Sequence, residues 1–143
     1  MLLKTAEPKY SEPISAFLKQ MDQIQKDYDW AMQEEDRLDK LTQDYLHMLE
    51  MAELSYHDRA RIAKYIKECR KERRNAKDII ATTMPVVDFL NSEKGKVLIG
   101  QLQQILGKVR KAEANINLRS YMPRVLSKEQ FDSHMNDSVV PHD

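Results

Sequence analysis

Asp44 and His47 are the two residues whose types and spacing come closest to a metal site. Their i, i+3 spacing is one half of the carboxylate–histidine set that holds two metal ions in helical bundles, which needs a second such pair and two further glutamates. No second pair is present, so a solvated helix face explains these side chains better. Cys69 lies among apolar residues at helical spacing, which favours an unreactive thiol in the core. We therefore expect no catalytic residue, no metal and no cofactor.

Two further patterns are similar to parts of known metal sites. Glu50 and Glu53 fit one half of the pattern that holds Mg²⁺ in the helical nucleotide pyrophosphatases, and the other half is missing. His57 and Asp58 are similar to the metal-binding dipeptide of phosphohydrolases but lack the further ligands, and Asp58 is better explained as a helix-capping residue. A metal-dependent nucleotide hydrolase is thus a remote alternative to a protein without enzymatic activity.

Basic residues dominate residues 59–77, and a helix this basic could lie along the phosphates of a nucleic acid. Residues 55–81 sum to a net charge of +5, whereas residues 20–54 sum to −7. Attraction between two neighbouring helices of one chain is therefore the competing explanation. The candidate nucleic-acid contacts are Arg61, Lys64, Lys67, Arg70, Lys71, Arg74 and Lys77.

Trp30 is the only tryptophan, and it lies among charged and polar residues rather than on an apolar stripe. A large ring at such a position is either packed beneath a later helix or the C-terminal tail, or it anchors a binding partner. The sequence leaves both alternatives open, and Trp30 is the first candidate for contact with a protein partner.

An apolar stripe with alternating spacings of four and three residues runs through residues 14–52 and positions these side chains. This is the heptad pattern of a long helix in a coiled-coil-like bundle, with Ser11 as the expected N-cap. The stripe widens after Leu38, which predicts two covering neighbours there and one nearer the start. Its members are Phe17, Met21, Ile24, Tyr28, Ala31, Glu35, Leu38, Thr42, Tyr45, Leu49 and Ala52.

A second heptad stretch begins at Ser55, with Asp58 three residues later as a near capping box. Arg73 falls where an apolar residue is expected. The helix should end near residues 82–83, because Pro85 disfavours a helical residue before it and can itself begin the next helix. A third helix follows, with a kink or break at residues 91–95, where its apolar pattern stops. The apolar positions of the second stretch are Ile62, Ile66, Cys69, Ala76 and Ile80.

These patterns predict an all-α fold, an elongated antiparallel three-helix bundle with coiled-coil-like packing. Residues 1–126 are expected to form a single domain with helices at about 12–53, 56–82 and 85–119. Residues 127–143 are expected to hold one short helix, capped by Ser127 with Gln130, and a disordered tail, and the first ten residues a mobile arm.

In an antiparallel hairpin that turns at residues 53–55, positions whose numbers add to about 109 face each other. Glu35 then lies across from Arg73, and we expect an ion pair that fixes the register more than it adds stability. A second helix ending near residue 82 reaches back only to about residue 27. The N-terminal arm or a second subunit must then cover the remaining apolar residues, which are Phe17, Leu18, Met21 and Ile24.

Composition favours a soluble helical protein, since 32% of the 143 residues are charged and only 3 are glycine. The longest uncharged runs, residues 79–87 and 97–107, are far shorter than the roughly 18 residues that span a membrane, and no signal peptide is recognisable at the start. A single cysteine excludes an internal disulfide, which fits a reducing compartment. We therefore expect a cytoplasmic protein without a membrane partner.

Several runs resemble small helical proteins of phages and prophages of Gram-positive bacteria: residues 42–47 (TQDYLH), 70–78 (RKERRNAKD), 110–113 (RKAE) and 119–125 (RSYMPRV). The resemblance covers about residues 25–126 and implies an intracellular accessory or host-interaction role, with no catalytic residue carried over. The sequence as a whole predicts a non-enzymatic protein that binds a macromolecular partner, first of all a protein, and that self-associates. Binding of nucleic acid through the basic second helix is the alternative.

Overall fold

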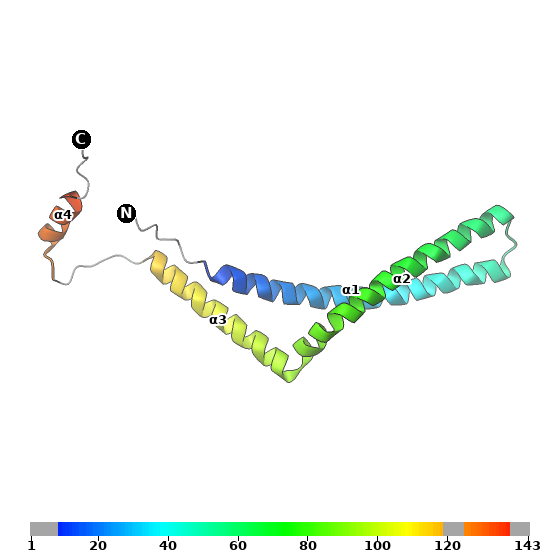
Figure 1. Ribbon diagram of the computed structural model, residues 1–143, viewed down its shortest axis with the longest axis horizontal. Helices are drawn as coiled ribbons and strands as arrows, with labels where there is room; N and C mark the ends of the chain where they lie inside the picture. The colour runs from blue at the N-terminus through cyan, green and yellow to red at the C-terminus, as the bar shows by residue number, and fades with distance from the viewer. Residues whose placement is uncertain (1–8, 119–124, 138–143) are drawn as a thin grey trace.

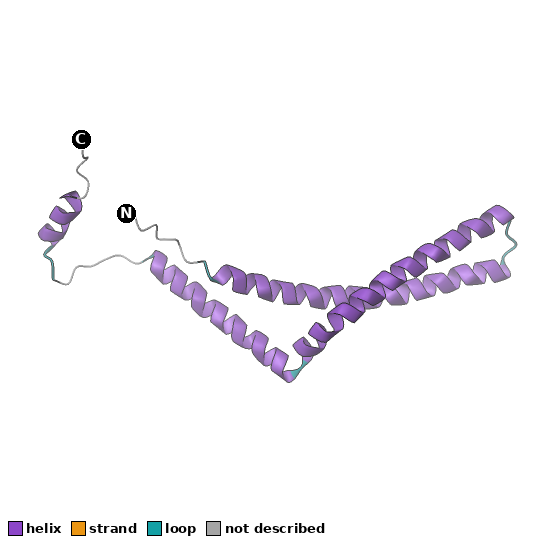
Figure 2. Ribbon diagram, in the orientation of Figure 1, coloured by secondary structure: helices purple, strands orange, loops and turns teal. Residues whose placement is uncertain are grey.

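The computed structural model describes residues 9–118 and 125–137, which contain four helices and no strand (Figures 1 and 2). The helices are α1 (Ser11–Met51), α2 (Tyr56–Asn91), α3 (Glu93–Asn117) and α4 (Lys128–Asp137). The three long helices pack against one another, so the fold is an elongated all-α three-helix bundle, as predicted. Within the described residues, α4 makes no contact with the other helices.

The hairpin of α1 and α2 has the predicted register. The guanidinium of Arg73 lies 3.6 Å from a carboxylate oxygen of Glu35, and the rings of Tyr45 and Tyr65 are 5.6 Å apart between centroids. Arg73 also donates a hydrogen bond to Asp39, a second partner that the register did not predict. The Glu35–Arg73 and Tyr45–Tyr65 contacts join positions whose numbers add to about 109, so the seam pattern placed the two helices correctly.

The hairpin core is the predicted pair of stripes. Ala31 and Leu38 of α1 are fully buried, and Ile62, Cys69 and Ala76 of α2 are buried against them. Toward the start of α1 the half-buried position moves from the predicted Phe17 to Leu18, and Phe17 is exposed. A straight α-helix drifts by about 20° per heptad, so a strict heptad stripe leaves the contact line over a helix of 41 residues.

The prediction that the second helix ends at residues 82–83 is wrong, because α2 continues through Pro85 to Asn91. Proline removes one backbone hydrogen bond and disfavours the helix by about 3 kcal/mol. Burial on both sides of the proline outweighs this effect, since Ala76 is 1% exposed and Val87 3% exposed. The hydroxyl groups of Thr82 and Thr83 also donate to helix carbonyls one turn back, at 2.7 and 2.6 Å.

Ser92 forms a sharp corner between α2 and α3 (Figure 1). Its backbone is extended, and its hydroxyl oxygen accepts a hydrogen bond from the Gly95 N–H at 3.1 Å, which caps α3. A Cβ on Gly95 would lie 1.8 Å from the carbonyl oxygen of Phe89, so only glycine fits beside the end of α2. The break predicted at residues 91–95 is therefore confirmed, but it separates two helices instead of interrupting a third helix that begins at Pro85.

Beyond the corner, α3 runs back along the first half of α1 and ends beside its start (Figure 1). The expectation of two covering neighbours after Leu38 is thus wrong: Leu46 and Met48 stay 48% and 44% exposed. The widened stripe of α1 signals exposed apolar surface, because α3 is turned toward the other end.

Hydrogen bonds at the helix starts confirm two of three predicted caps. Ser55 accepts from the Asp58 N–H, and Ser127 and Gln130 form a reciprocal capping box at α4. Ser11 is not an N-cap, because its N–H and its hydroxyl both donate to the carboxylate of Glu113, at 2.9 and 2.7 Å. The expected N-terminal arm falls mostly on residues 1–8 and the expected tail mostly on residues 138–143, which lie outside the described residues.

Candidate functional site

The α1–α2 hairpin presents two broad faces, one on each side of its apolar seam. In an antiparallel helix pair, the residues that flank the seam on the same side of both helices form one face. We call the first face the charged face; it combines α2 residues Lys67, Arg70, Arg74 and Lys77 with α1 residues Asp29, Asp36 and Asp39. The second is the Trp30 face, which combines Trp30, Glu34 and Arg37 of α1 with Glu72 of α2.

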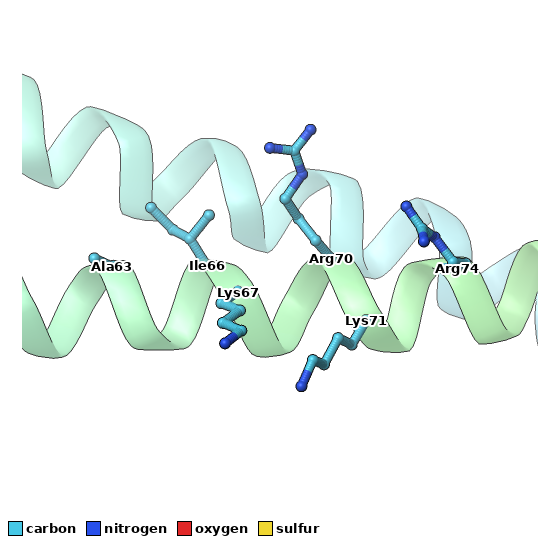
Figure 3. A pocket seen from close by; sticks show the side chains of 6 residues that line it. All are labelled: Ala63, Ile66, Lys67, Arg70, Lys71 and Arg74. Atoms are coloured by element: carbon cyan, nitrogen blue, oxygen red, sulfur yellow. The ribbon is translucent and has the colours of Figure 1, made fainter.

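A shallow groove along α2 marks the basic half of the charged face (Figure 3). Arg70 and Arg74 extend to the same side as Ile66, whereas Lys67 and Lys71 extend to the other side. The six lining residues form two adjacent rows on the helix, which together cover about 140° of its circumference at 3.6 residues per turn. They are Ala63, Ile66, Lys67, Arg70, Lys71 and Arg74.

Pairing within the chain explains Arg73 and none of the seven basic residues predicted as nucleic-acid contacts. All seven side chains are exposed, and no carboxylate of the described residues lies within ion-pair distance of them. Several acids of α1 are instead paired along α1 itself, as in Asp22–Lys26 and Asp36–Lys40. Arg73 differs because it lies on the seam, where α1 is within reach. The basic surface of α2 therefore lacks direct countercharges from its neighbour.

Trp30 is 52% exposed. The structure thus does not bury it beneath a later helix, because α3 covers the start of α1 and the lining of their shared groove extends only to Gln25. On the next turn of the same side, Arg37 donates to Glu34 and thereby lowers the pKa of that carboxyl group. The indole ring is left half in solvent on a surface rich in carboxylates.

The other candidate partner residues are less exposed than predicted. Phe17 is 43% exposed, but Met21 and Ile24 are half-buried. Met21 and Leu18 line a groove together with Leu90 of α2 and with Ile99 of α3. The sequence predicted that the N-terminal arm or a second subunit covers this stripe. Instead α2, which is nine residues longer than expected, and α3 cover part of it, while Phe17 stays exposed.

None of the three metal-like patterns acquires further ligands among the described residues. Asp44 and His47 line a shallow pocket near the end of α1 with three apolar neighbours. Among the described residues, no group of three or more His, Cys, Asp or Glu is placed to hold a metal ion. Cys69 is buried and unpaired, which confirms its prediction as a core thiol.

Sequence reasoning missed two contacts that position α3. One is the Ser11–Glu113 contact, between residues 102 positions apart, for which the sequence carries no signal. The other is the close approach of Gly95 to Phe89. The spacing of Ser92 and Gly95 is a helix-capping signal that could have indicated this corner.

None of the helices in residues 9–118 and 125–137 combines the length and the apolar character needed to cross a membrane. Comparisons with protein-family models, with curated proteins and with solved structures find nothing that matches this chain. The resemblance to phage and prophage proteins therefore stays a prediction, and the function is argued from the surfaces alone.

Proposed function

We propose that the protein is a non-enzymatic interaction protein that binds another protein through the Trp30 face of its hairpin. The observation that carries the proposal is the 52% exposure of the only tryptophan. Tryptophan is enriched among the residues that dominate binding energy, because one ring buries a large amphipathic surface at small entropic cost. An exposed position in the middle of a rigid helix suits such an anchor.

The total surface supports a role in binding. Only seven apolar side chains of the described residues are buried, so most of the helical surface faces solvent. An elongated bundle with so much surface can present long helical faces to a partner while its small core stays intact.

The charges around Trp30 favour a basic partner segment. Asp27 and Glu34 lie one turn before and one turn after the tryptophan. The pKa of Arg37 is raised mainly by its hydrogen bond with Glu34 and in addition by the nearby carboxylate of Glu72 of α2. With Arg37 already bound to Glu34, carboxylates outnumber free cations on this face. A helix or strand with an apolar residue for the indole and lysine or arginine beside it would be complementary.

The test compares Trp30→Ala with Met51→Ala, which removes a side chain that is 78% exposed. Each purified variant is used for affinity purification from the native host and for circular dichroism, and tryptophan quenching is measured on the wild type. We expect Trp30→Ala to leave helicity and melting temperature nearly unchanged and to weaken capture of one protein by about tenfold or more, a loss of at least about 1.4 kcal/mol. Met51→Ala should retain that protein.

Two results would overturn the proposal. One is a large fall in melting temperature for Trp30→Ala together with quencher-protected fluorescence in the wild type, which would make Trp30 a packing residue. The other is equal capture by the wild type and by both variants.

A second candidate function is nucleic-acid binding through α2, favoured by the exposure of the seven basic residues predicted as contacts, four of which lie on the charged face. Against it, packed helices lie about 8–10 Å apart, so the carboxylates of α1 would lie close to a bound phosphate backbone. At physiological salt the Debye length is about 8 Å, and this repulsion is only partly screened. Salt-sensitive retention on DNA or RNA that is lost in Arg70→Glu/Arg74→Glu would support this function instead.

A phage accessory or host-interaction role in the cytoplasm is the biological setting that we propose, and it rests on the resemblance of residues 25–126. Identification of the captured protein tests it directly, because a bacterial host protein is the expected partner and a phage structural protein would point to assembly.

A further inference from the structure

We propose that the charged face of the hairpin binds the charged face of a second copy, so that α2 of each copy lies on α1 of the other. The contact uses the part of the hairpin that α3 leaves free, about residues 29–50 of α1 and 59–80 of α2. It lies on the opposite side from Trp30 and is therefore independent of the proposed function.

Charge complementarity supports a second copy as the occupant. The same chain offers an exposed basic row, with Lys67, Arg70 and Arg74, and beside it an exposed acidic row that includes Asp29 and Asp36. The Asp36–Lys40 pair is two-thirds or more exposed, so it can be exchanged for a pair between copies with little loss. Residues 20–54 and 55–81 carry opposite net charges of −7 and +5, and a partner with the same two rows neutralises both.

The register makes the arrangement self-complementary. A two-fold axis parallel to the hairpin places each α1 antiparallel to α2 of the other copy and keeps every residue at its own level along the axis. In the hairpin Arg74 lies level with Asp36, and Arg70 lies level with Asp39. The rotation therefore brings Arg74 of one copy opposite Asp36 of the other, and the contact occurs twice.

Apolar side chains at the edge of the seam would be buried in the proposed dimer interface. Met32 is 46% exposed and Leu46 is 48% exposed, and both flank the seam on the charged face beside Ala63 and Lys77 of α2. A free face about 33 Å long and 20 Å wide covers roughly 650 Å² per copy, near the roughly 800 Å² per partner of a standard interface. A four-helix arrangement of this kind has an apolar centre and a charged rim.

The experiment measures the mass of the full-length protein by sedimentation equilibrium or light scattering at micromolar concentration. We expect a dimer that weakens with salt, because the Debye length falls from about 10 Å at 0.1 M to about 3 Å at 1 M. Arg70→Glu/Arg74→Glu removes the positive charge of the basic row, because two carboxylates then balance Lys67 and Lys77, and Asp29→Arg/Asp36→Arg gives the acidic row a positive charge. Each variant alone should be a monomer, with self-association weakened by about tenfold or more.

Mixing the two variants is the decisive experiment. In the mixed pair the unchanged acidic row meets the unchanged basic row, and the carboxylates introduced into α2 of one variant meet the guanidinium groups introduced into α1 of the other, so the two variants should form a 1:1 heterodimer. An unfolded variant would not form a dimer on mixing, so the mixing experiment also shows that both variants are folded. The matched control is Asp44→Arg/Glu68→Arg, which changes two charges outside the charged face and should leave the wild-type dimer unchanged.

Three results would overturn the inference: a wild-type protein that stays monomeric at tens of micromolar, variants that each dimerise like the wild type, or variants that fail to combine when mixed. A monomer that binds DNA through Arg70 and Arg74 would assign the basic row to nucleic acid instead. Trp30→Ala should not alter the dimer, so failure of this inference and failure of the proposed function are separate outcomes.

Discussion

The two ends of this bundle are held together by different means. In the α1–α2 hairpin, an uninterrupted seam joins the helices, and its centre buries Ala31, Leu38, Ile62, Cys69 and Ala76. At the other end, only Gly95 and Leu106 of α3 are buried, and the helix is placed by a corner and by the Ser11–Glu113 contact. The hairpin end depends on apolar packing, whereas the α3 end depends on a steric fit and a few polar contacts.

This difference indicates unequal local stability. Segments with few buried apolar contacts open at lower free energy than the core of the same protein. We therefore expect α3 to separate from α1 more readily than α2 does. Substitutions in the hairpin should lower the free energy of global unfolding, whereas substitutions near α3 should mainly change how α3 is held against α1.

The largest effect is expected for Leu38→Ala in the hairpin core. Leu38 is fully buried, and comparable truncations lower the free energy of unfolding by about 2.7–5 kcal/mol. Chemical denaturation measures the change, with Leu46→Ala as the matched control, since Leu46 is 48% exposed and should lose far less. Equal losses in the two variants would show that the hairpin core is not where the stability lies.

A smaller effect is expected for Gly95→Ala at the corner. The new Cβ would lie 1.8 Å from the Phe89 carbonyl, so either the corner opens or α3 shifts, with a loss of about 1–3 kcal/mol. Gly107→Ala is the control, because nothing lies within 4 Å of the position that its Cβ would occupy. This substitution should raise the free energy of unfolding by about 0.5–1 kcal/mol. Thermal unfolding of both variants gives the comparison. A Gly95→Ala protein as stable as Gly107→Ala would contradict the tight corner.

The smallest effect is expected at the Ser11–Glu113 contact. Hydrogen bonds from the Ser11 hydroxyl and N–H lower the pKa of Glu113 below its ordinary value of 4.5. Because the folded-state pKa is the lower one, the stabilisation is present above the unfolded pKa and is lost as the pH falls through the folded pKa. Amide exchange at the start of α1, corrected for intrinsic rates, should therefore rise in acid with little change in global melting.

Glu113→Gln should show the faster exchange already at neutral pH, and its difference from the wild type should vanish in acid. Glu129→Gln, in α4, is the control and should behave like the wild type at both pH values, because among the described residues α4 does not pack against α1, α2 or α3. Exchange in Glu113→Gln that matches the wild type at neutral pH would show that the contact does not hold α3.

The hairpin was predictable in detail, and the candidate surfaces only in part. The ion pair between Glu35 and Arg73 followed from two stripes and a short loop, because a fixed period leaves one register that buries both stripes. The sequence placed Trp30 off the seam but left its burial by another segment open, and the structure leaves the residue 52% exposed. Whether the basic residues of α2 faced α1 did not follow, because net charge per segment does not say which side of a helix carries it.

By itself, the sequence determined the helical class, the α1–α2 register and the caps at Ser55 and Ser127, all of which depend on residues close in sequence or on one periodic pattern. The tertiary structure alone decided that α2 passes through Pro85 and that α3 returns along the first half of α1. Burial of Val87 outweighs the local cost of the proline, and the place of α3 depends on Glu113 meeting Ser11. Such contacts join residues whose proximity no local pattern encodes, so only the folded chain brings them together.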